Sequence, residues 1–299
     1  MAETPILELI DSFKAYLVLE RNYAKGTLIE YGSDLEAFVE YLQINKKEKQ
    51  LKTISSINED DIRIYIENLF LKSKCKSITI SRKISSLRSF FTFLKDRRYI
   101  DHNPTLEIKS PKIPKKLPIY LTENELIRLL ATPDQTNAEG IRDFAILILF
   151  SYTGMRISEL QGLNLNSLNF DENSVKVMGK GSKERVIPLI EPVIQSLRKY
   201  IAIRPMADTE ALIISKQKKR ISIRALRDIV YKYRKLAGIS VNNFSPHKLR
   251  HTFATLLHNR DVDILDIQAL LGHASIATTQ IYTHTNSKRL REAVNKIDK

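Results

Sequence analysis

Apolar side chains recur every three or four residues along most of this chain, which is the spacing of an amphipathic helix. In the first hundred residues the pattern predicts four helices, at about 4–19, 25–43, 59–72 and 77–98. Asn58 stands directly before the third predicted helix and is a favourable N-cap residue. The N-terminal part of the chain is therefore predicted to be a small four-helix domain.

The second half of the chain is also dominated by helical periodicity. Thr122, with Glu125 three residues later, has the spacing of a capping box and starts the first of these helices. Helices are predicted near 122–131, 138–153, 190–203, 222–237, 246–258, 263–271, 276–283 and 287–297.

Three short runs interrupt this helical pattern. The runs 167–170, 174–178 and 184–188 are β-branched or alternating, and turn-forming residues separate them. Such runs predict a three-stranded antiparallel sheet. The predicted fold class is mainly α with one small three-stranded antiparallel sheet.

The stretch NPTLEIKSPKIPKKLP at 103–118 contains four prolines and four lysines. Proline removes a backbone donor and restricts the residue before it, so this stretch is expected to be extended rather than helical. It predicts a basic linker between an N-terminal domain at 1–102 and a C-terminal domain at 119–299. Lys115 and Lys116 in this linker are candidate contacts to a phosphate backbone.

The composition is that of a folded protein. Of the 299 residues, 43% are apolar, which is enough for two cores. The sequence contains no run of 18 apolar residues, and its N-terminus is acidic and amphipathic where a signal peptide is basic and then apolar. A cytoplasmic location without membrane contact is therefore expected. The single cysteine, Cys75, excludes an internal disulfide and a cysteine zinc cluster.

The formal net charge of +14 points to a polyanionic partner. Basic residues are concentrated at 72–98 and at 216–235, each with a single acidic residue among them. Clusters of this kind are typical of nucleic-acid binding, and Arg220 and Arg224 in the second cluster are candidate DNA contacts.

The predicted helix at 77–98 has an apolar stripe and a polar stripe. The polar stripe comprises Ser77, Ser81, Ser85, Arg88, Thr92 and Lys95. Small hydroxyl groups followed by cations suit insertion into a major groove, although a solvated helix face has a similar composition. We expect Ser81, Ser85, Arg88 and Lys95 to contact DNA.

Two histidines, His247 and His251, lie four residues apart in SPHKLRHTFATLLHN, which is the spacing of two zinc ligands on a helix. A hydrolytic zinc site would also need a glutamate at 248, where this chain has lysine. Arg250 lies between the histidines, and its permanent charge would oppose a metal ion. The sequence also has no close cluster of Asp and Glu to hold a pair of metal ions. No metal and no other cofactor is expected.

A phosphate fits these residues better. The arginine fork matches two phosphoryl oxygens, and His247 and Arg250, three residues apart, share one face of a helix. Further along, Gly272 is expected to end a helix directly before His273, and Tyr282 follows nine residues later. Each of these residues alone has a common structural explanation.

Four segments of the chain form a recognisable set: TGMRISEL around Arg156, MGKGSKERVIPL around Lys180, HKLRHTFAT around His247 and Arg250, and LGHASIATTQIYTH around His273 and Tyr282. Together they make the whole chain resemble the tyrosine recombinases, which are related to phage integrases. The resemblance is strongest to the Xer-type recombinases that resolve chromosome dimers. The chain departs from the family after the third segment, where it reads LLHNRDVDI.

The resemblance implies an N-terminal helical, SAM-like domain and a C-terminal catalytic domain that closes around double-stranded DNA. Tyr282 would be the nucleophile that forms a 3′-phosphotyrosyl intermediate, and Arg156 and Arg250 would bind the scissile phosphate. Lys180 would donate a proton to the leaving oxygen, while His247 and His273 would assist. The expected chemistry requires neither ATP nor metal.

The resemblance also implies a tetramer on paired DNA sites, with identical subunits or with a paralogous recombinase, and in some members a DNA translocase takes part. In the family, the C-terminal tail docks into a neighbouring subunit. We expect site-specific recombination that resolves chromosome or plasmid dimers at cell division. A phage or mobile-element integrase, a topoisomerase of the same chemistry, and a catalytically silent DNA-binding protein remain as alternatives.

Overall fold

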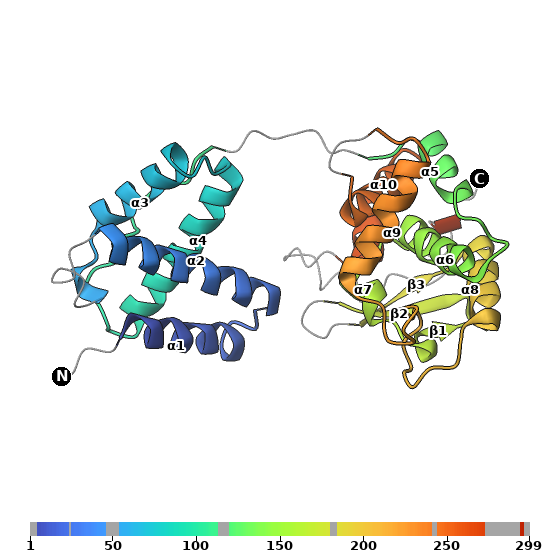
Figure 1. The fold of residues 1–299 in the computed structure, drawn as a ribbon, viewed down its shortest axis with the longest axis horizontal. Coiled ribbons are helices and arrows are strands. Elements are labelled where there is room, and N and C mark those ends of the chain that lie inside the picture. Colours follow the sequence, from blue (N-terminus) through green and yellow to red (C-terminus); the bar gives the residue numbers. More distant parts are fainter. Residues whose placement is uncertain are drawn as a thin grey trace. The chain divides into compact units, whose positions relative to one another are not determined.

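The computed structural model describes residues 5–23, 25–45, 54–112, 120–179, 184–240, 244–272 and 294–295. The chain divides into two compact units, Met1–Lys116 and Leu117–Lys299, each with its own hydrophobic core (Figure 1). The division falls inside the predicted linker at 103–118. The described residues are mainly helical, with one three-stranded antiparallel sheet, which confirms the predicted fold class.

The described part of the N-terminal unit forms four α-helices, as predicted. They are α1 (Ile6–Leu19), α2 (Lys25–Asn45), α3 (Glu59–Leu71) and α4 (Ser77–Asp96), with a short 3-10 helix, η1 (Ile54–Ser56), before α3. Asn58 caps α3, because its side chain accepts from the Asp61 N–H at 3.0 Å while Asp61 Oδ2 accepts from the Asn58 N–H at 2.9 Å. This capping box fixes where α3 begins.

Helix α4 has the two faces that its sequence predicts. Its apolar stripe, Ile80, Ile84, Leu87, Phe91 and Leu94, is buried in the core of the N-terminal unit. The polar stripe stays accessible, with Ser81 and Ser85 partly exposed and Arg88 and Lys95 exposed. The core is rich in aromatic rings, among them Phe13, whose ring contacts Phe90 edge-on at 5.4 Å between centroids.

A buried carboxylate joins α2 to α4. The side chain of Asp34 on α2 is only 3% exposed and binds Arg82 and, at 3.0 Å, Lys83 Nζ. Ser86 Oγ also donates to it, at 2.9 Å. Two of the cations in the basic cluster at 72–98 are therefore directed at a protein carboxylate.

The first part of the predicted linker packs into the N-terminal unit instead of lying extended. Asn103, Thr105 and Ile108 are buried, and Arg88 Nη2 donates to the Ile108 carbonyl at 2.7 Å. Asn103 Oδ1 accepts from the Thr105 N–H at 2.9 Å and from its hydroxyl at 2.7 Å. Prolines do exclude a helix here, but they do not prevent the apolar Ile108 from joining the core.

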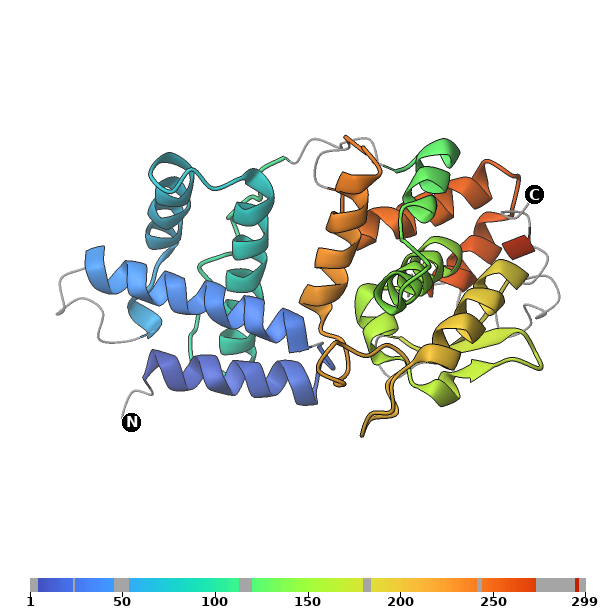
Figure 2. The same cartoon turned by 45° about the vertical axis from the view of Figure 1, so that its right-hand side comes forward.

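The C-terminal unit is a set of helices around α6 with the sheet at one side (Figures 1 and 2). Its helices are α5 (Glu123–Ala131), α6 (Ala138–Thr153), α7 (Ile157–Gly162), α8 (Glu191–Ile203), α9 (Ile223–Leu236), α10 (Pro246–His258) and α11 (Ile264–Leu271). Helix α6 contacts α5, α7, α8, α9 and α10. Every side chain from Ala145 to Phe150 of α6 is buried, as expected for a helical segment at the centre of a core.

The sheet has the order β1-β2-β3 and is antiparallel throughout. Its strands are β1 (Leu168–Asn169), β2 (Ser174–Met178) and β3 (Glu184–Pro188), and a 3-10 helix, η2 (Leu165–Ser167), precedes them. Val177 pairs with Arg185 in the register of β2 and β3. Since Val175, Val177 and Ile187 are buried, one face of the sheet packs on the core.

Within the described residues, the helices predicted from the sequence are present, and one further helix, α7, was not predicted. Six residues are too few to show helical periodicity. The helix predicted at 276–283 and most of the one at 287–297 lie outside the described residues. Residues 294–295 are helical, and Val294 is buried in the core of the C-terminal unit. Among the described residues, no helix has the length and apolar character to cross a membrane.

Candidate active site

Arg156 is placed by a glycine turn. Helix α6 ends at Gly154, whose φ of 60° is left-handed. A Cβ at this position would lie 2.4 Å from Phe253 Cδ1 and 2.8 Å from Leu271 Cδ2. Both the backbone conformation and the packing therefore require glycine. The chain reverses through the buried Met155, and Arg156 becomes the N-cap of α7.

A capping-box bond to Glu159 then orients Arg156. The Arg156 N–H donates to Glu159 Oε2 at 2.6 Å, and Nη1 donates to Oε1 at 2.8 Å. Its Nη2 lies 3.3 Å from the Gly272 carbonyl. The Arg156 side chain remains 31% exposed, so part of its guanidinium can meet a ligand.

Arg250 lies on α10 and is held by two main-chain carbonyls. Its Nη1 donates to the Gly154 carbonyl at 2.7 Å, and its Nη2 donates to the Leu271 carbonyl at 2.6 Å. Burial, followed by repulsion from Arg156, lowers the pKa of Arg250 to about 10. The guanidinium stays charged at neutral pH. The positive charges of Arg156 and Arg250 are close enough to repel each other.

Glu159 is the anion that offsets this positive charge. Its side chain is 3% exposed and accepts from a further arginine, Arg185 on β3, with Nη1 at 2.9 Å and Nη2 at 2.8 Å. Burial alone would raise the pKa of Glu159, but hydrogen bonds from Arg185 and Arg156 outweigh it and lower the pKa to about 2. The carboxylate is therefore ionised and shared between two arginines.

His247 precedes Arg250 by one turn of α10. Its side chain keeps solvent exposure, yet partial desolvation, followed by the charges of Arg250, Arg227 and Arg156, lowers its pKa. Its ring is consequently neutral near pH 7 and can accept a proton. The pKa of His251 is lowered too, by desolvation and then by Lys248. No group of three His, Cys, Asp or Glu side chains suited to a metal occurs among the described residues.

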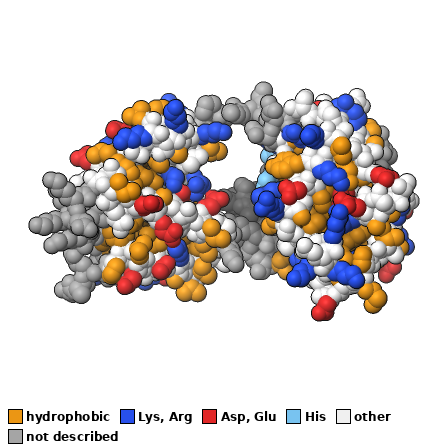
Figure 3. Space-filling view, viewed as in Figure 1, with side chains coloured by type: hydrophobic (Ala, Val, Ile, Leu, Met, Phe, Trp, Pro, Cys, Tyr) orange, Lys and Arg blue, Asp and Glu red, His pale blue; other side chains and the backbone are white. Residues whose placement is uncertain are grey.

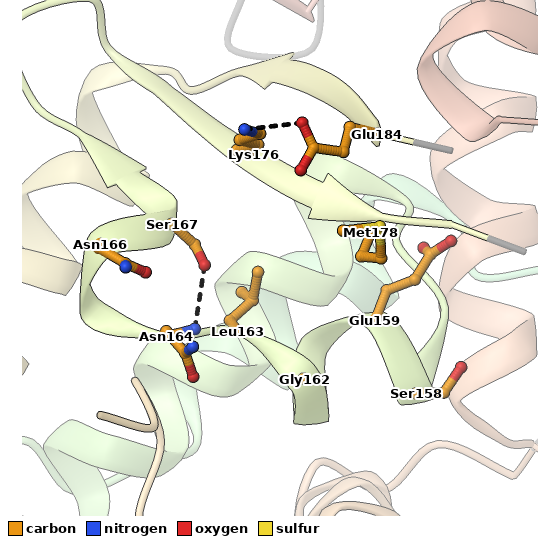
Figure 4. A pocket seen from close by; sticks show the side chains of 10 residues that line it. All are labelled: Ser158, Glu159, Gly162, Leu163, Asn164, Asn166, Ser167, Lys176, Met178 and Glu184. Atoms are coloured by element: carbon orange, nitrogen blue, oxygen red, sulfur yellow. Dashed lines mark hydrogen bonds and ion pairs between the residues drawn. The ribbon is translucent and has the colours of Figure 1, made fainter. Parts of the chain in front are cut away.

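A pocket lies beside α7 and the sheet (Figure 4). Glu159 and Ser158 line it from α7, and Met178 lines it from β2. An ion pair of 2.6 Å between Lys176 and Glu184 crosses from β2 to β3 on its wall. Polar groups thus continue from the arginine cluster toward the ends of β2 and β3.

Three of the six predicted catalytic residues are described, and the structure brings them together: Arg156, His247 and Arg250. Lys180, which stands between β2 and β3 in the sequence, lies outside the described residues, as do His273 and Tyr282. In the sequence His273 directly follows Gly272, whose carbonyl meets Arg156. The predicted catalytic roles remain predictions.

The predicted DNA contacts differ in how they are held. Lys115 and Lys116 lie outside the described residues. Arg224 is exposed on α9, whereas Arg220 donates to the carbonyls of Gln161 and Leu163 at 2.9 and 3.0 Å. Those bonds favour a structural role for Arg220. Figure 3 shows Lys and Arg side chains spread over the visible face of the C-terminal unit, with histidine exposed at one edge.

Glu159 and Arg185 were not singled out from the sequence. Glu159 follows Arg156 by three residues, the capping-box spacing, and stands between the apolar Ile157 and Leu160. This spacing was a usable signal for Glu159. No local signal marks Arg185, because its partners come from segments distant in the sequence.

The chain matches the phage integrase family over residues 120–289, and the N-terminal SAM-like domain of phage integrases over residues 10–98. It is 39% identical to the tyrosine recombinase XerC of Thermodesulfovibrio yellowstonii, covering 96% of this chain and 95% of the relative. It is 36% identical to the tyrosine recombinase XerD of Staphylococcus epidermidis, covering 95% of this chain and 96% of the relative.

A solved structure supports the same fold. The XerH site-specific recombinase bound to a palindromic difH substrate, in a post-cleavage complex, superposes with a TM-score of 0.70 at 22% identity, covering 97% of this chain and 85% of that one. The chain therefore belongs to the phage integrase family, the tyrosine recombinases, and is similar over nearly its whole length to members of the Xer type.

Proposed function

We propose that this protein is a site-specific DNA recombinase that cuts and rejoins double-stranded DNA through a 3′-phosphotyrosyl intermediate. The observation that carries the proposal is the pair Arg156 and Arg250, which adjacent carbonyls hold at one place. The chain is also similar over nearly its whole length to proteins named as tyrosine recombinases. Two fixed guanidiniums are suited to the charge that develops on the non-bridging oxygens of a scissile phosphate.

In the first step the phenol oxygen of Tyr282 attacks the phosphorus, and the bond from phosphorus to the 5′-oxygen breaks. Lys180 donates a proton to that oxygen, which is otherwise a poor leaving group. The lowered pKa of His247 leaves its ring free to accept the phenol proton. His273 holds a phosphate oxygen. A new 5′-hydroxyl attacks the phosphotyrosine in the reverse step, so no cofactor is needed.

The two units divide the work of DNA binding. In the N-terminal unit the accessible stripe of α4, with Ser81, Ser85, Arg88 and Lys95, enters the major groove. Lys115 and Lys116 of the linker and Arg224 of α9 contact phosphates. The net charge of +14 supplies the electrostatic part of the affinity.

The assembly is a tetramer on two DNA sites, formed either by this chain alone or together with a paralogous recombinase, with a DNA translocase as a further partner. Its biological role is the resolution of chromosome or plasmid dimers at cell division, in the cytoplasm. The C-terminal tail would couple neighbouring active sites. Val294 packs into its own unit, so Leu290, Ala293 and Ile297 are the tail residues proposed for the neighbour.

One experiment can identify both the DNA site that the protein cuts and the residue that acts as nucleophile. A library of randomised duplexes, each nicked so that the short strand diffuses away after cleavage, traps protein covalently on the sites that it cuts. Mass spectrometry of the trapped complex should place the phosphate on Tyr282. Tyr282→Phe should bind the selected site with unchanged affinity and give no covalent complex.

A phosphate on another residue, or strict dependence on magnesium, would contradict the mechanism. Two further assays separate the related functions. Exchange of strands between two selected sites identifies a recombinase, whereas relaxation of supercoiled plasmid without exchange identifies a topoisomerase. Binding without any covalent complex identifies a DNA-binding protein that has lost catalysis.

A further inference from the structure

Three consecutive carbonyls at the end of α11 each accept a hydrogen bond from a different arginine. The Leu270 carbonyl accepts from Arg185 Nε at 3.0 Å, the Leu271 carbonyl from Arg250 Nη2 at 2.6 Å, and the Gly272 carbonyl from Arg156 Nη2 at 3.3 Å. The last carbonyls of a helix lack partners within the helix and carry its negative dipole end. This helix end is thus a common anchor for all three guanidiniums.

Arg185 differs from the other two arginines in what it has left for a ligand. Its two Nη atoms bind the two oxygens of Glu159, and its Nε binds the Leu270 carbonyl. Its side chain is 13% exposed, against 31% for Arg156, while Arg250 is buried at 7%. All three nitrogens of the Arg185 guanidinium therefore already donate to protein, which leaves two of its five N–H groups and favours a positioning role over holding the phosphate itself.

We infer that Arg185 is a positioning residue for strand cleavage, which orients Arg156 through Glu159. The inference rests on the proposed function. Each oxygen of Glu159 accepts one bond from Arg156 and one from Arg185. Arg185 thereby sets the angle at which the carboxylate presents Arg156 to the scissile phosphate, and through Leu270 it fixes β3 to the end of α11.

Gly272 supplies a second line of evidence. Its φ is 60°, and a Cβ there would lie 2.9 Å from Arg185 Nη1 and 3.0 Å from Arg185 Cδ. The side chain of Arg185 passes across this glycine in a space that any other residue would fill. The end of α11 is therefore shaped around Arg185 as well as bonded to it.

Arg185→Lys tests the inference, because lysine keeps the charge but cannot hold both Glu159 oxygens and a carbonyl together. Cleavage rates are measured at saturating DNA on the selected nicked site and on the same site with a methylphosphonate at the scissile position. The methyl group replaces one charged non-bridging oxygen. The cleavage rate of this substrate therefore depends less on charge stabilisation by Arg156 and Arg250. A loss of folded protein affects both substrates equally.

We expect Arg185→Lys to bind DNA as the wild type does, to cleave the phosphodiester at least about tenfold more slowly, and to lose about threefold or less on the methylphosphonate. Equal losses on the two substrates, or no loss on either, would overturn the inference. A wild-type protein that forms no covalent complex would overturn the proposed function and this inference together. A reactive wild type with an unchanged substrate ratio in the variant would overturn the inference alone.

Two further variants provide a second test and a control. Gly272→Ala displaces Arg185 without changing it and should shift the substrate ratio in the same direction, which keeps the test open if Arg185→Lys folds poorly. Arg204→Lys is the matched control, because Arg204 also binds carbonyls of the C-terminal unit, Leu212 at 3.2 Å and Ala211 at 2.7 Å, without bonding to the cluster. A shift of the ratio in Arg204→Lys would count against the inference.

Discussion

Each unit of this protein contains a buried carboxylate shared by two cations, Asp34 in the N-terminal unit and Glu159 in the C-terminal unit. Both carboxylates are 3% exposed. The exposures of their partners are also alike, at 37% and 14% for Arg82 and Lys83, and 31% and 13% for Arg156 and Arg185. Burial alone does not tell the two clusters apart.

The difference lies in what else the cations bind. Around Asp34 the further contacts are side chains, namely the Ser86 hydroxyl on the carboxylate and Glu30 at 3.8 Å from Arg82. Around Glu159 the arginines also bind main-chain carbonyls, which cannot rotate away. A cluster that only joins two helices tolerates movement of its cations, whereas one that aims a guanidinium at a substrate does not. Among the described residues, anchoring to the backbone thus distinguishes the Glu159 cluster from the Asp34 cluster.

The sharpest test of this comparison is Glu159→Gln, which keeps the shape and removes the charge. Two arginines then lose their shared anion, which should cost about 3 kcal/mol of unfolding free energy. Cleavage at saturating DNA should fall about a hundredfold per folded molecule, because Arg156 loses its orientation. Chemical denaturation and single-turnover cleavage measure the two effects. Unchanged cleavage would mean that Glu159 serves stability alone.

The pH dependence of stability gives the second test. The pKa of Glu159 is depressed to about 2 in the folded chain, from an ordinary value of 4.5. A depressed carboxyl contributes stability above its unfolded pKa and loses it as the pH falls toward the folded pKa. The contribution, about 3 kcal/mol, should therefore disappear between about pH 4.5 and pH 2. Denaturation of wild type and Glu159→Gln across this window should show a shallower slope in the variant.

Asp34→Asn is the matched change in the other unit. It should lower the unfolding free energy by about 2 kcal/mol, less than a fully buried pair would lose, because Arg82 retains solvent contact. Cleavage per folded molecule should stay within about twofold of wild type, since no backbone acceptor depends on this carboxylate. A large fall in cleavage with intact DNA binding would remove the distinction between the clusters.

The smallest expected effect concerns DNA affinity. Lys95→Ala removes an exposed cation of the α4 stripe and should reduce the salt dependence of binding by about one phosphate contact. Arg82→Gln removes a cation that lies against two carboxylates, those of Asp34 and Glu30, and should leave that dependence unchanged. Binding titrations over a range of salt concentrations would compare them. Equal reductions would show that a cation paired with a carboxylate still counts toward DNA binding.

Local pattern was enough to predict most of the fold. Periodicity located the helices, and the capping residues Asn58 and Thr122 fixed two of their starts. The short helix α7 was missed because six residues carry too little periodic signal. The prolines around Ile108 predict an extended chain, and a single apolar side chain in the sequence does not reveal that it joins the core of the N-terminal unit.

In the candidate site, too, some residues could be predicted from the sequence and others only from the structure. Arg156, His247 and Arg250 stand in segments whose composition marks them, and the structure brings these three together. Arg185 finds its partners 26 and 85 residues away, so only the folded chain places it in the cluster. The residues proposed to bind the phosphate lie in recognisable sequence motifs. Arg185, which holds such residues in place, is identified only by its tertiary contacts.

Gly154 combines three demands in one residue. It reverses the chain with a left-handed backbone, leaves room for Phe253 and Leu271, and offers its carbonyl to Arg250. A change that satisfied one demand would fail another, so no single compensating substitution nearby restores all three. Position 154 consequently couples the end of α6 to the orientation of Arg250, so that a substitution made there to alter packing would also reach the phosphate-binding cluster.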